Sequence, residues 1–298
     1  MKNNFVSRFL FTLSLRLTFF IPNPITGTII SNGEKRGYLL YVPPGYDPAR
    51  PSPLVICIHG YAEWPAHQRE ISRWNALAEQ HAFLVVYPSG TGFPRHWRTS
   101  AAPGRDNDAQ RDVNFISSLI DQLQEQYNLD PARIYANGLS NGGGMSFVLA
   151  CKLAGRIAAI GSVAGAYLLP WEACQPSRPV PAILVHGTAD PIVPYQGGPS
   201  GAFNIPFPAV PTWVEELARR NGCMDAPVPI RVSEAVSGRL YPRGWPNRDV
   251  VFYTIRGGGH TWPGSKPLPG WLAGPTSQEI DATQTMWEFF VRHPLDAA

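Results

Sequence analysis

The segment Gly138-Leu139-Ser140-Asn141-Gly142 carries the residue types that point most directly to chemistry. It follows a short apolar run and opens a helix-like run, and a G-x-S-x-G sequence in this strand–turn–helix context presents a serine hydroxyl as a nucleophile. The small glycines allow the sharp turn, and the helix N-terminus behind the serine favours negative charge. The pattern alone is weak because glycine and serine are common, so it is the context that makes Ser140 our candidate nucleophile.

A serine nucleophile needs a neutral imidazole that accepts its proton. Where the serine lies on such a turn, the chain order of the catalytic groups is Ser, then Asp or Glu, then His, and only His260 and His293 lie late enough. His260 follows three glycines directly after a strand-like run, and the carboxyl end of a strand is where parallel-sheet enzymes place functional groups. We therefore expect His260 to be the general base, and His293, beside Pro294, to cap a helix or to be exposed.

Asp190 is the candidate for the acid that orients the histidine. It follows the run at 182–187 and precedes a proline, which predicts a turn at the end of a strand. A carboxylate there would fix the imidazole tautomer and stabilise the imidazolium. Asp225, Asp249 and Glu234 are rivals, but Asp225 follows a helix, and Asp249 precedes a strand and should lie at the opposite edge of the sheet. Aspartate before proline is otherwise a common turn residue, and the chain order is what favours Asp190.

The oxyanion that forms during attack needs backbone N–H donors. One should come from Asn141, the residue after the nucleophile, and one from Tyr61 in the loop after the first long apolar run. His59 in the same loop is expected to be structural, because the base is already assigned. Trp97 and Trp262 are expected to contact the substrate, although tryptophans more often pack in a core or under a loop.

Seven short apolar runs must form the framework that positions these residues. Continuous apolar runs are typical of strands that are buried on both faces of a parallel sheet. The runs are residues 38–42, 54–58, 83–87, 133–136, 158–163, 182–185 and 250–255. Because helical patterns lie between them, the sequence predicts an α/β protein with a mostly parallel sheet covered by helices.

Helices and loops can also be placed. Apolar residues recur with helical spacing over residues 113–127, and Thr276 and Glu279 have the spacing of a capping box at the start of the last helix. Three aperiodic stretches are longer than ordinary connections. We expect these stretches, residues 88–111, 191–211 and 233–249, to be loops around an active site.

Composition bounds the class of protein. The chain has 298 residues, 44% of them hydrophobic and 16% charged, which indicates a globular protein with a well-filled core. The net charge is only +3 and the basic residues are scattered, so no nucleic-acid partner is expected. Four cysteines occur in no zinc-binding spacing, and no metal or cofactor is expected. Cys151 and Cys174 can bridge in an oxidising compartment, and free thiols remain the alternative.

The first 27 residues form a separate N-terminal segment. Lys2 and Arg8 precede the largely apolar residues 9–21, as in a signal peptide, but Arg16 interrupts the run and no clear cleavage site follows. No stretch reaches the roughly 18 uncharged apolar residues of a membrane span. Our interpretation is secretion, with removal of the segment left open, and residues 28–298 as one catalytic domain.

Four segments together resemble a known family. HGY at 59–61, RIYANGLSNGGGM at 133–145, HGTADPIVPYQGG at 186–198 and GGGHTWPG at 257–264 look like the polyhydroxybutyrate depolymerase family of esterases. That family is related to the feruloyl and acetyl xylan esterases of carbohydrate esterase family 1. The resemblance covers about residues 35–292, and its last two motifs are far more specific than G-x-S-x-G.

The resemblance implies the α/β-hydrolase fold without a cap domain, a secreted enzyme, and triad positions at Ser140, Asp190 and His260. Two departures stand out. The family often has paired aspartates where Arg111-Asp112 stands here, and a second cysteine that often follows the one at position 223 is missing. The missing cysteine leaves Cys151–Cys174 as the only disulfide that we expect.

The predicted function is therefore hydrolysis of a carboxylic ester through an acyl-enzyme, and a polymeric ester is among the candidate substrates. Polyester, feruloyl and acetyl-xylan substrates are equally compatible with the sequence. A serine peptidase of the same fold is the alternative, although the predicted loops offer few charged anchors for a peptide terminus. A catalytically inactive binding protein is a third class, against which the filled triad positions argue.

Overall fold

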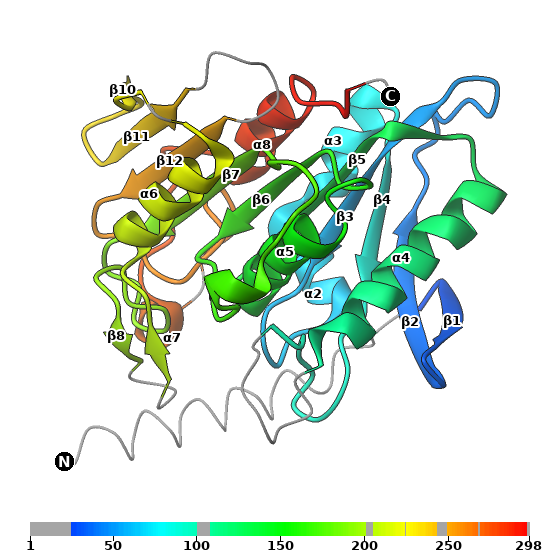
Figure 1. Ribbon diagram of the computed structural model, residues 1–298, viewed down its shortest axis with the longest axis horizontal. Coiled ribbons are helices and arrows are strands. Elements are labelled where there is room, and N and C mark those ends of the chain that lie inside the picture. The colour runs from blue at the N-terminus through cyan, green and yellow to red at the C-terminus, as the bar shows by residue number, and fades with distance from the viewer. Residues whose placement is uncertain are drawn as a thin grey trace.

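The computed structural model describes residues 25–99, 108–200, 205–223, 225–242, 249–267 and 269–296. Ten strands within these residues form one mixed sheet (Figure 1). Its order is β1 (Gly27–Ser31), β2 (Glu34–Tyr41), β4 (Leu84–Pro88), β3 (Ser52–Ile58), β5 (Leu129–Leu139), β6 (Ala159–Val163), β7 (Ala182–Gly187), β12 (Val250–Ile255), β11 (Val236–Tyr241) and β10 (Val228–Arg231). Neighbours from β4 to β12 are parallel and the outer pairs are antiparallel, which confirms the predicted mostly parallel sheet.

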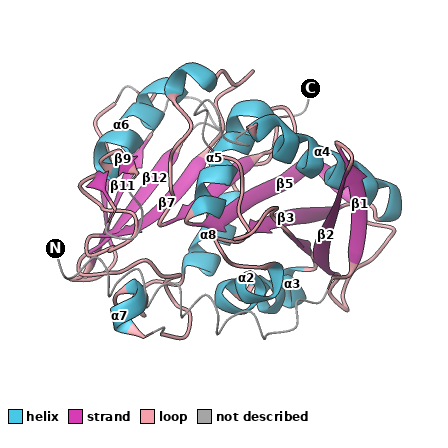
Figure 2. Ribbon diagram, turned by 90° about the horizontal axis from the view of Figure 1, so that it is seen from below, coloured by secondary structure: helices cyan, strands magenta, loops and turns pink. Residues whose placement is uncertain are grey.

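Helices cover both faces of the sheet (Figure 2). One face carries α4 (Ala109–Gln126), α5 (Asn141–Lys152) and α6 (Val210–Asn221), and the other carries α2 (Pro65–Ser72), α3 (Trp74–His81) and α8 (Ala282–Phe290). Shorter elements are η1 (Trp171–Ala173), α7 (Gly270–Ala273) and the pair β8 (Gly198–Pro199) and β9 (Pro206–Phe207). The layered arrangement confirms the predicted α/β-hydrolase fold class.

Strand β3 shows why its sequence is continuously apolar. Leu54 and Ile56 pack into the core on the α4–α5 face, whereas Val55 and Cys57 pack into the core on the α3–α8 face. Successive side chains of a strand point to opposite faces, so a strand covered on both sides needs apolar residues at every position. All seven apolar runs of the sequence overlap strands in the structure.

Two local predictions were wrong. Residues 233–249 were expected to form a loop, but β11 lies within them, paired with β10 and β12. The expected capping box at Thr276 is absent, because α8 begins at Ala282 and Asp281 caps it by accepting hydrogen bonds from Thr283 N and Gln284 N. The predicted amphipathic helix over 113–127 is confirmed as α4, whose apolar stripe is buried.

The structure joins Cys151, near the end of α5, to Cys174 in a disulfide. This bond ties α5 to the segment after η1 and closes a loop with a sequence separation of 23 residues. Within the described ranges, every helix is too short or too polar to cross a membrane.

Candidate active site

Ser140 lies on the turn between β5 and α5 with φ 57° and ψ −119°. This conformation is strained for a residue with a side chain, and it is the conformation that a nucleophile elbow requires. The flanking glycines make the turn possible: a Cβ on Gly142 would lie 2.2 Å from Ile58 O, and one on Gly138 would lie 2.5 Å from the Gly142 carbonyl carbon. The sequence therefore places a serine side chain at the carboxyl edge of the sheet, with 8% of its surface exposed.

Asp190 and His260 meet at the same edge, because β7 and β12 are parallel neighbours. His260 Nδ1 lies 2.8 Å from Asp190 Oδ2, and the other carboxylate oxygen accepts hydrogen bonds of 2.8 Å from Ile192 N and Val193 N. The loop before the histidine is fixed by a hydrogen bond from His260 N to Ala273 O. The acid is thus held by the backbone, and the imidazole is held by the acid.

The electrostatics of this pair fit a general base. Burial alone raises the pKa of the Asp190 carboxyl, but His260 and His186 lower it well below its usual range. Burial alone lowers the pKa of His260, but the Asp190 charge and hydrogen bond, with a contribution from Glu63, leave that pKa raised. An ionised aspartate that donates no proton makes His260 Nδ1 the protonated nitrogen, which directs Nε2 to act as the acceptor.

The structure records no hydrogen bond between Ser140 Oγ and His260 among the residues it describes. In unliganded hydrolases this contact is often long and tightens when substrate binds. The chemistry of the arrangement is therefore that of a nucleophile, a base and an orienting acid at one sheet edge.

The expected oxyanion donors lie in the segments that follow β3 and β5. Asn141 is the first residue of α5, and the first N–H groups of a helix have no partner within the helix. Tyr61 follows β3 and lies between two anchored amides, since Gly60 N donates to Glu63 Oε2 over 2.9 Å and Ala62 N donates to Arg95 O over 2.7 Å. The strands β3 and β5 are parallel neighbours, so both loops reach the same edge.

His59 lies at the same edge but binds only backbone. Its Nδ1 is 2.7 Å from Gly60 O, and its Nε2 accepts a hydrogen bond of 2.9 Å from Gly90 N. Burial lowers its pKa to about 4, so the ring stays neutral at ordinary pH. This placement agrees with the structural role that the sequence suggested.

The two tryptophans that were expected to contact the substrate are both buried. Trp97 is 2% exposed, donates its indole N–H to His59 O over 3.0 Å and stacks on Phe115. Trp262 is 1% exposed and donates its indole N–H to Thr283 Oγ1 over 3.0 Å. Rings with so little accessible surface have almost no area with which to contact a ligand, and both pack inside the protein.

The rival acids lie elsewhere. Asp249 precedes β12 and is 3.2 Å from His293 Nε2, at the end of the strand opposite to His260. Asp225 and Glu234 are exposed. None of the three contacts His260 among the described residues.

Three side chains of the site escaped the sequence analysis. The Asn141 side chain binds the backbone of Trp97, His186 Nε2 lies 3.3 Å from Asp190 Oδ2, and Glu63 holds Gly60 N. Of these three side chains, only His186 had a signal in the sequence. It lies four residues before the acid, in the motif that carried the family resemblance. Within the described ranges, no cluster of three or more His, Cys, Asp or Glu side chains could hold a metal ion.

Comparisons with known proteins identify relatives of this chain. The family model described as "Esterase PHB depolymerase" matches residues 36–173. The chain is 30% identical over 287 residues to the putative esterase NocK of Nocardia uniformis subsp. tsuyamanensis, covering 88% of this chain and 81% of that one. It is 26% identical over 279 residues to the probable feruloyl esterase C of Aspergillus niger, covering 90% and 88%.

A solved structure gives the same picture of the fold. The acetyl xylan esterase from Aspergillus awamori superposes with a TM-score of 0.63 at 17% identity, covering 89% of this chain and 98% of that one. Some relatives are larger than the matched region: the chain covers 58% of feruloyl esterase C of Emericella nidulans.

Proposed function

The chain belongs to the family of esterases described by the polyhydroxybutyrate depolymerase model, and we propose from this premise that Ser140, His260 and Asp190 hydrolyse its ester substrate. Hydrolysis of a carboxylic ester is the activity that its relatives share by name. The single observation that supports the catalytic assignment is the convergence of the strained Ser140 turn and the 2.8 Å His260–Asp190 contact at one sheet edge.

In the acylation step, Ser140 Oγ attacks the ester carbonyl carbon while His260 Nε2 takes the hydroxyl proton. Asp190 keeps the Nδ1 proton in place and stabilises the imidazolium that forms. The backbone N–H groups of Asn141 and Tyr61 donate to the oxyanion. The imidazolium then protonates the departing alcohol, and the acyl group remains on Ser140.

In the deacylation step, water takes the place of the alcohol. His260 removes a proton from the water, which attacks the acyl carbonyl, and the proton is returned to Ser140 Oγ as the acid leaves. Both steps use the same base and the same oxyanion donors.

The proposed substrates are feruloyl or acetyl esters of plant polysaccharide. The support is that a relative named probable feruloyl esterase C matches over 90% of this chain and a relative named bifunctional acetylxylan esterase/xylanase matches over 55% of it. A polyester such as polyhydroxybutyrate is a second candidate, supported by the name of the family model. The names of the relatives favour an ester substrate over the peptide substrate of a serine peptidase, which was the alternative function.

Secretion is part of the proposal. The Cys151–Cys174 disulfide supports it, because disulfides persist in oxidising compartments and are rare in the cytosol. The proposed leader, residues 1–27, lies almost entirely outside the described residues.

Two experiments test this function. A fluorophosphonate probe should label wild-type protein at Ser140 and leave Ser140→Ala unlabelled; equal labelling of both would refute the nucleophile. Hydrolysis of methyl ferulate, acetylated xylan and a polyhydroxybutyrate film should then be compared with that of a peptide panel. Cleavage of peptides in preference to all three esters would overturn the esterase assignment.

A further inference from the structure

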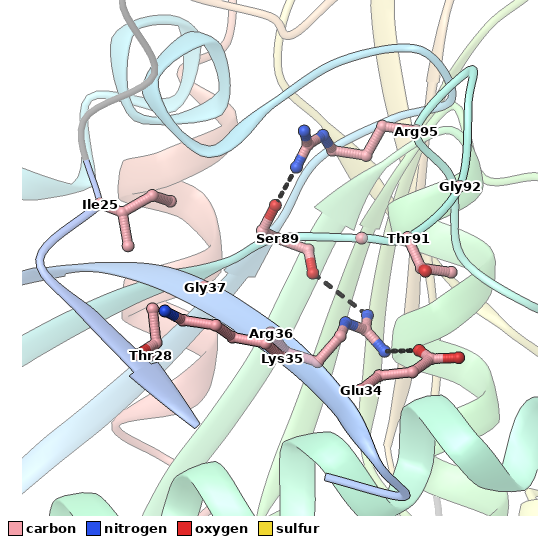
Figure 3. Close-up of a pocket in the computed structure, with 11 residues that line it drawn as sticks. Ile25, Thr28, Glu34, Lys35, Arg36, Gly37, Ser89, Thr91, Gly92 and Arg95 are labelled. Atoms are coloured by element: carbon pink, nitrogen blue, oxygen red, sulfur yellow. Dashed lines mark hydrogen bonds and ion pairs between the residues drawn. The ribbon is translucent and has the colours of Figure 1, made fainter. Parts of the chain in front are cut away.

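A cationic pocket lies against the loop that follows β4 (Figure 3). It has a volume of about 560 Å³ and is formed by β2, the start of β1 and the loop after β4. Three cations line it, Lys35, Arg36 and Arg95, whereas Glu34 is the only acidic residue among the described residues of its lining.

Two of these cations are held by one serine. Arg95 donates to the Ser89 hydroxyl, and Arg36 Nη2 donates to Ser89 O over 3.1 Å, so the two guanidinium groups approach Ser89 from opposite sides (Figure 3). The pKa of Arg95 is lowered by its burial and by the positive charge of Arg36. Such like-charge neighbours are unfavourable until an anion joins them.

The acids nearby are already engaged. Asp112 accepts from Arg36 Nη1 over 2.7 Å, and Glu34 forms ion pairs with Arg98 and Arg111. Lys35 and Arg95, by contrast, form no ion pair with any described acidic side chain. The pocket therefore has an excess of positive charge. Part of this charge is on the Arg95 guanidinium, whose planar N–H donors match the geometry of a carboxylate.

Hydrogen bonds connect the pocket to the loop at the carboxyl end of β3, where the proposed oxyanion donor Tyr61 lies. The backbone of Arg95 accepts the hydrogen bond from Ala62 N, next to the proposed oxyanion donor Tyr61. Gly90, which lines the pocket, donates its N–H to His59 Nε2. The loop after β4 therefore contributes the Arg95 side chain to the pocket, while the Arg95 backbone contacts the loop of Tyr61.

We propose that this pocket binds a carboxylate group, with Arg95 as the main ligand and Lys35 as a second cation. The carboxylate can belong to an acidic ester substrate, an inference that rests on the proposed function, or to a free carboxylic acid in solution. Both sources present a carboxylate to the pocket. Only a carboxylate on the substrate makes the rate of ester hydrolysis depend on the pocket.

The test compares wild type with Arg95→Gln and with a matched control, Arg50→Gln. Arg50 is 86% exposed, in the turn before β3, and pairs only with Asp47 among the described residues. For each protein, kcat/KM is measured for p-nitrophenyl butyrate and for mono-p-nitrophenyl glutarate, which adds a terminal carboxylate. Glutarate binding is measured by calorimetry at low ionic strength, and Arg95→Lys serves as the variant that keeps the charge.

For a substrate carboxylate, we expect the anionic-to-neutral ratio of kcat/KM to fall about tenfold in Arg95→Gln, to recover partly in Arg95→Lys and to stay at the wild-type value in Arg50→Gln. For a free carboxylic acid, the ratio stays constant while glutarate binding weakens about tenfold in Arg95→Gln alone. An unchanged ratio together with no glutarate binding to wild type overturns the proposal. If wild type hydrolyses neither ester, the proposed function fails, and the calorimetry still decides on the pocket.

Discussion

The side chain of Asn141 forms two hydrogen bonds with the backbone of Trp97: Oδ1 accepts from Trp97 N over 2.7 Å and Nδ2 donates to Trp97 O over 3.1 Å. A third bond of 3.1 Å runs from Nδ2 to Thr99 Oγ1. The residue that offers its N–H to the proposed oxyanion therefore also anchors the loop that follows β4. This double use links the first turn of α5 to a segment more than 40 residues away in the chain.

Asn141→Ala should keep the backbone N–H and lose the loop anchor. Buried donors and acceptors that lose their partners cost about 1–3 kcal/mol each, so we expect a lower melting temperature and a kcat reduced roughly tenfold or more. Asn114→Ala is the control, since Asn114 makes exposed side-chain hydrogen bonds on α4. Equal effects of the two substitutions would show that the anchor does not matter.

Ser140→Ala should remove the nucleophile without disturbing the fold. We expect kcat for a p-nitrophenyl ester to fall by about 10⁴-fold or more, with an unchanged circular dichroism spectrum. Near-wild-type turnover by a correctly folded variant would exclude the proposed acyl-enzyme.

Asp190→Asn should keep the shape of the side chain and favour the wrong tautomer of His260. The expected loss in kcat is roughly 10⁴-fold. Asp249→Asn is the matched control at the opposite end of the sheet, where it should affect only the contact with His293. A silent Asp190→Asn beside an inactive Asp249→Asn would reverse the assignment.

The pH dependence of kcat/KM should reflect the raised pKa of His260. Only the neutral ring accepts the Ser140 proton, so activity should rise with pH, with a midpoint above the ordinary imidazole value of about 6.5. Glu63→Gln should lower that midpoint, because it removes a negative charge that raises the pKa while its amide oxygen can still accept from Gly60 N. A maximum at pH 5 in wild type would contradict the mechanism.

Reduction of the Cys151–Cys174 disulfide should lower the free energy of unfolding by about 3 kcal/mol, for a closed loop of this length. Guanidinium unfolding with and without a reducing agent measures the difference. A variant with serine at both positions should be insensitive to the reducing agent. If wild type is equally insensitive, the disulfide is absent or does not contribute to stability.

The central sheet and the candidate triad could be predicted because their signals are local. The buried parallel strands contain short apolar runs, and Ser140, Asp190 and His260 each follow such a run within a few residues. β11 could not be found in this way, because an antiparallel strand near the sheet edge alternates buried and exposed residues and contains Gly238.

The placement of the tryptophans depends on contacts that no short pattern contains. Trp262 is buried because Thr283 of α8 accepts its indole N–H, and Trp97 is buried because it lies between His59 O and the Phe115 ring. The same holds for Glu63, whose charge helps to raise the pKa of His260, nearly 200 residues later in the chain. Long-range packing, rather than residue type, decided these positions.

Strand β10 ends the sheet with only four residues, among them Pro229 and Arg231. An exposed sheet edge is a template on which a strand of another molecule can assemble. A proline lacks the N–H that such assembly needs, and a charged residue in a short strand makes close stacking unfavourable. The composition of β10 therefore disfavours the addition of a strand from another molecule at this edge.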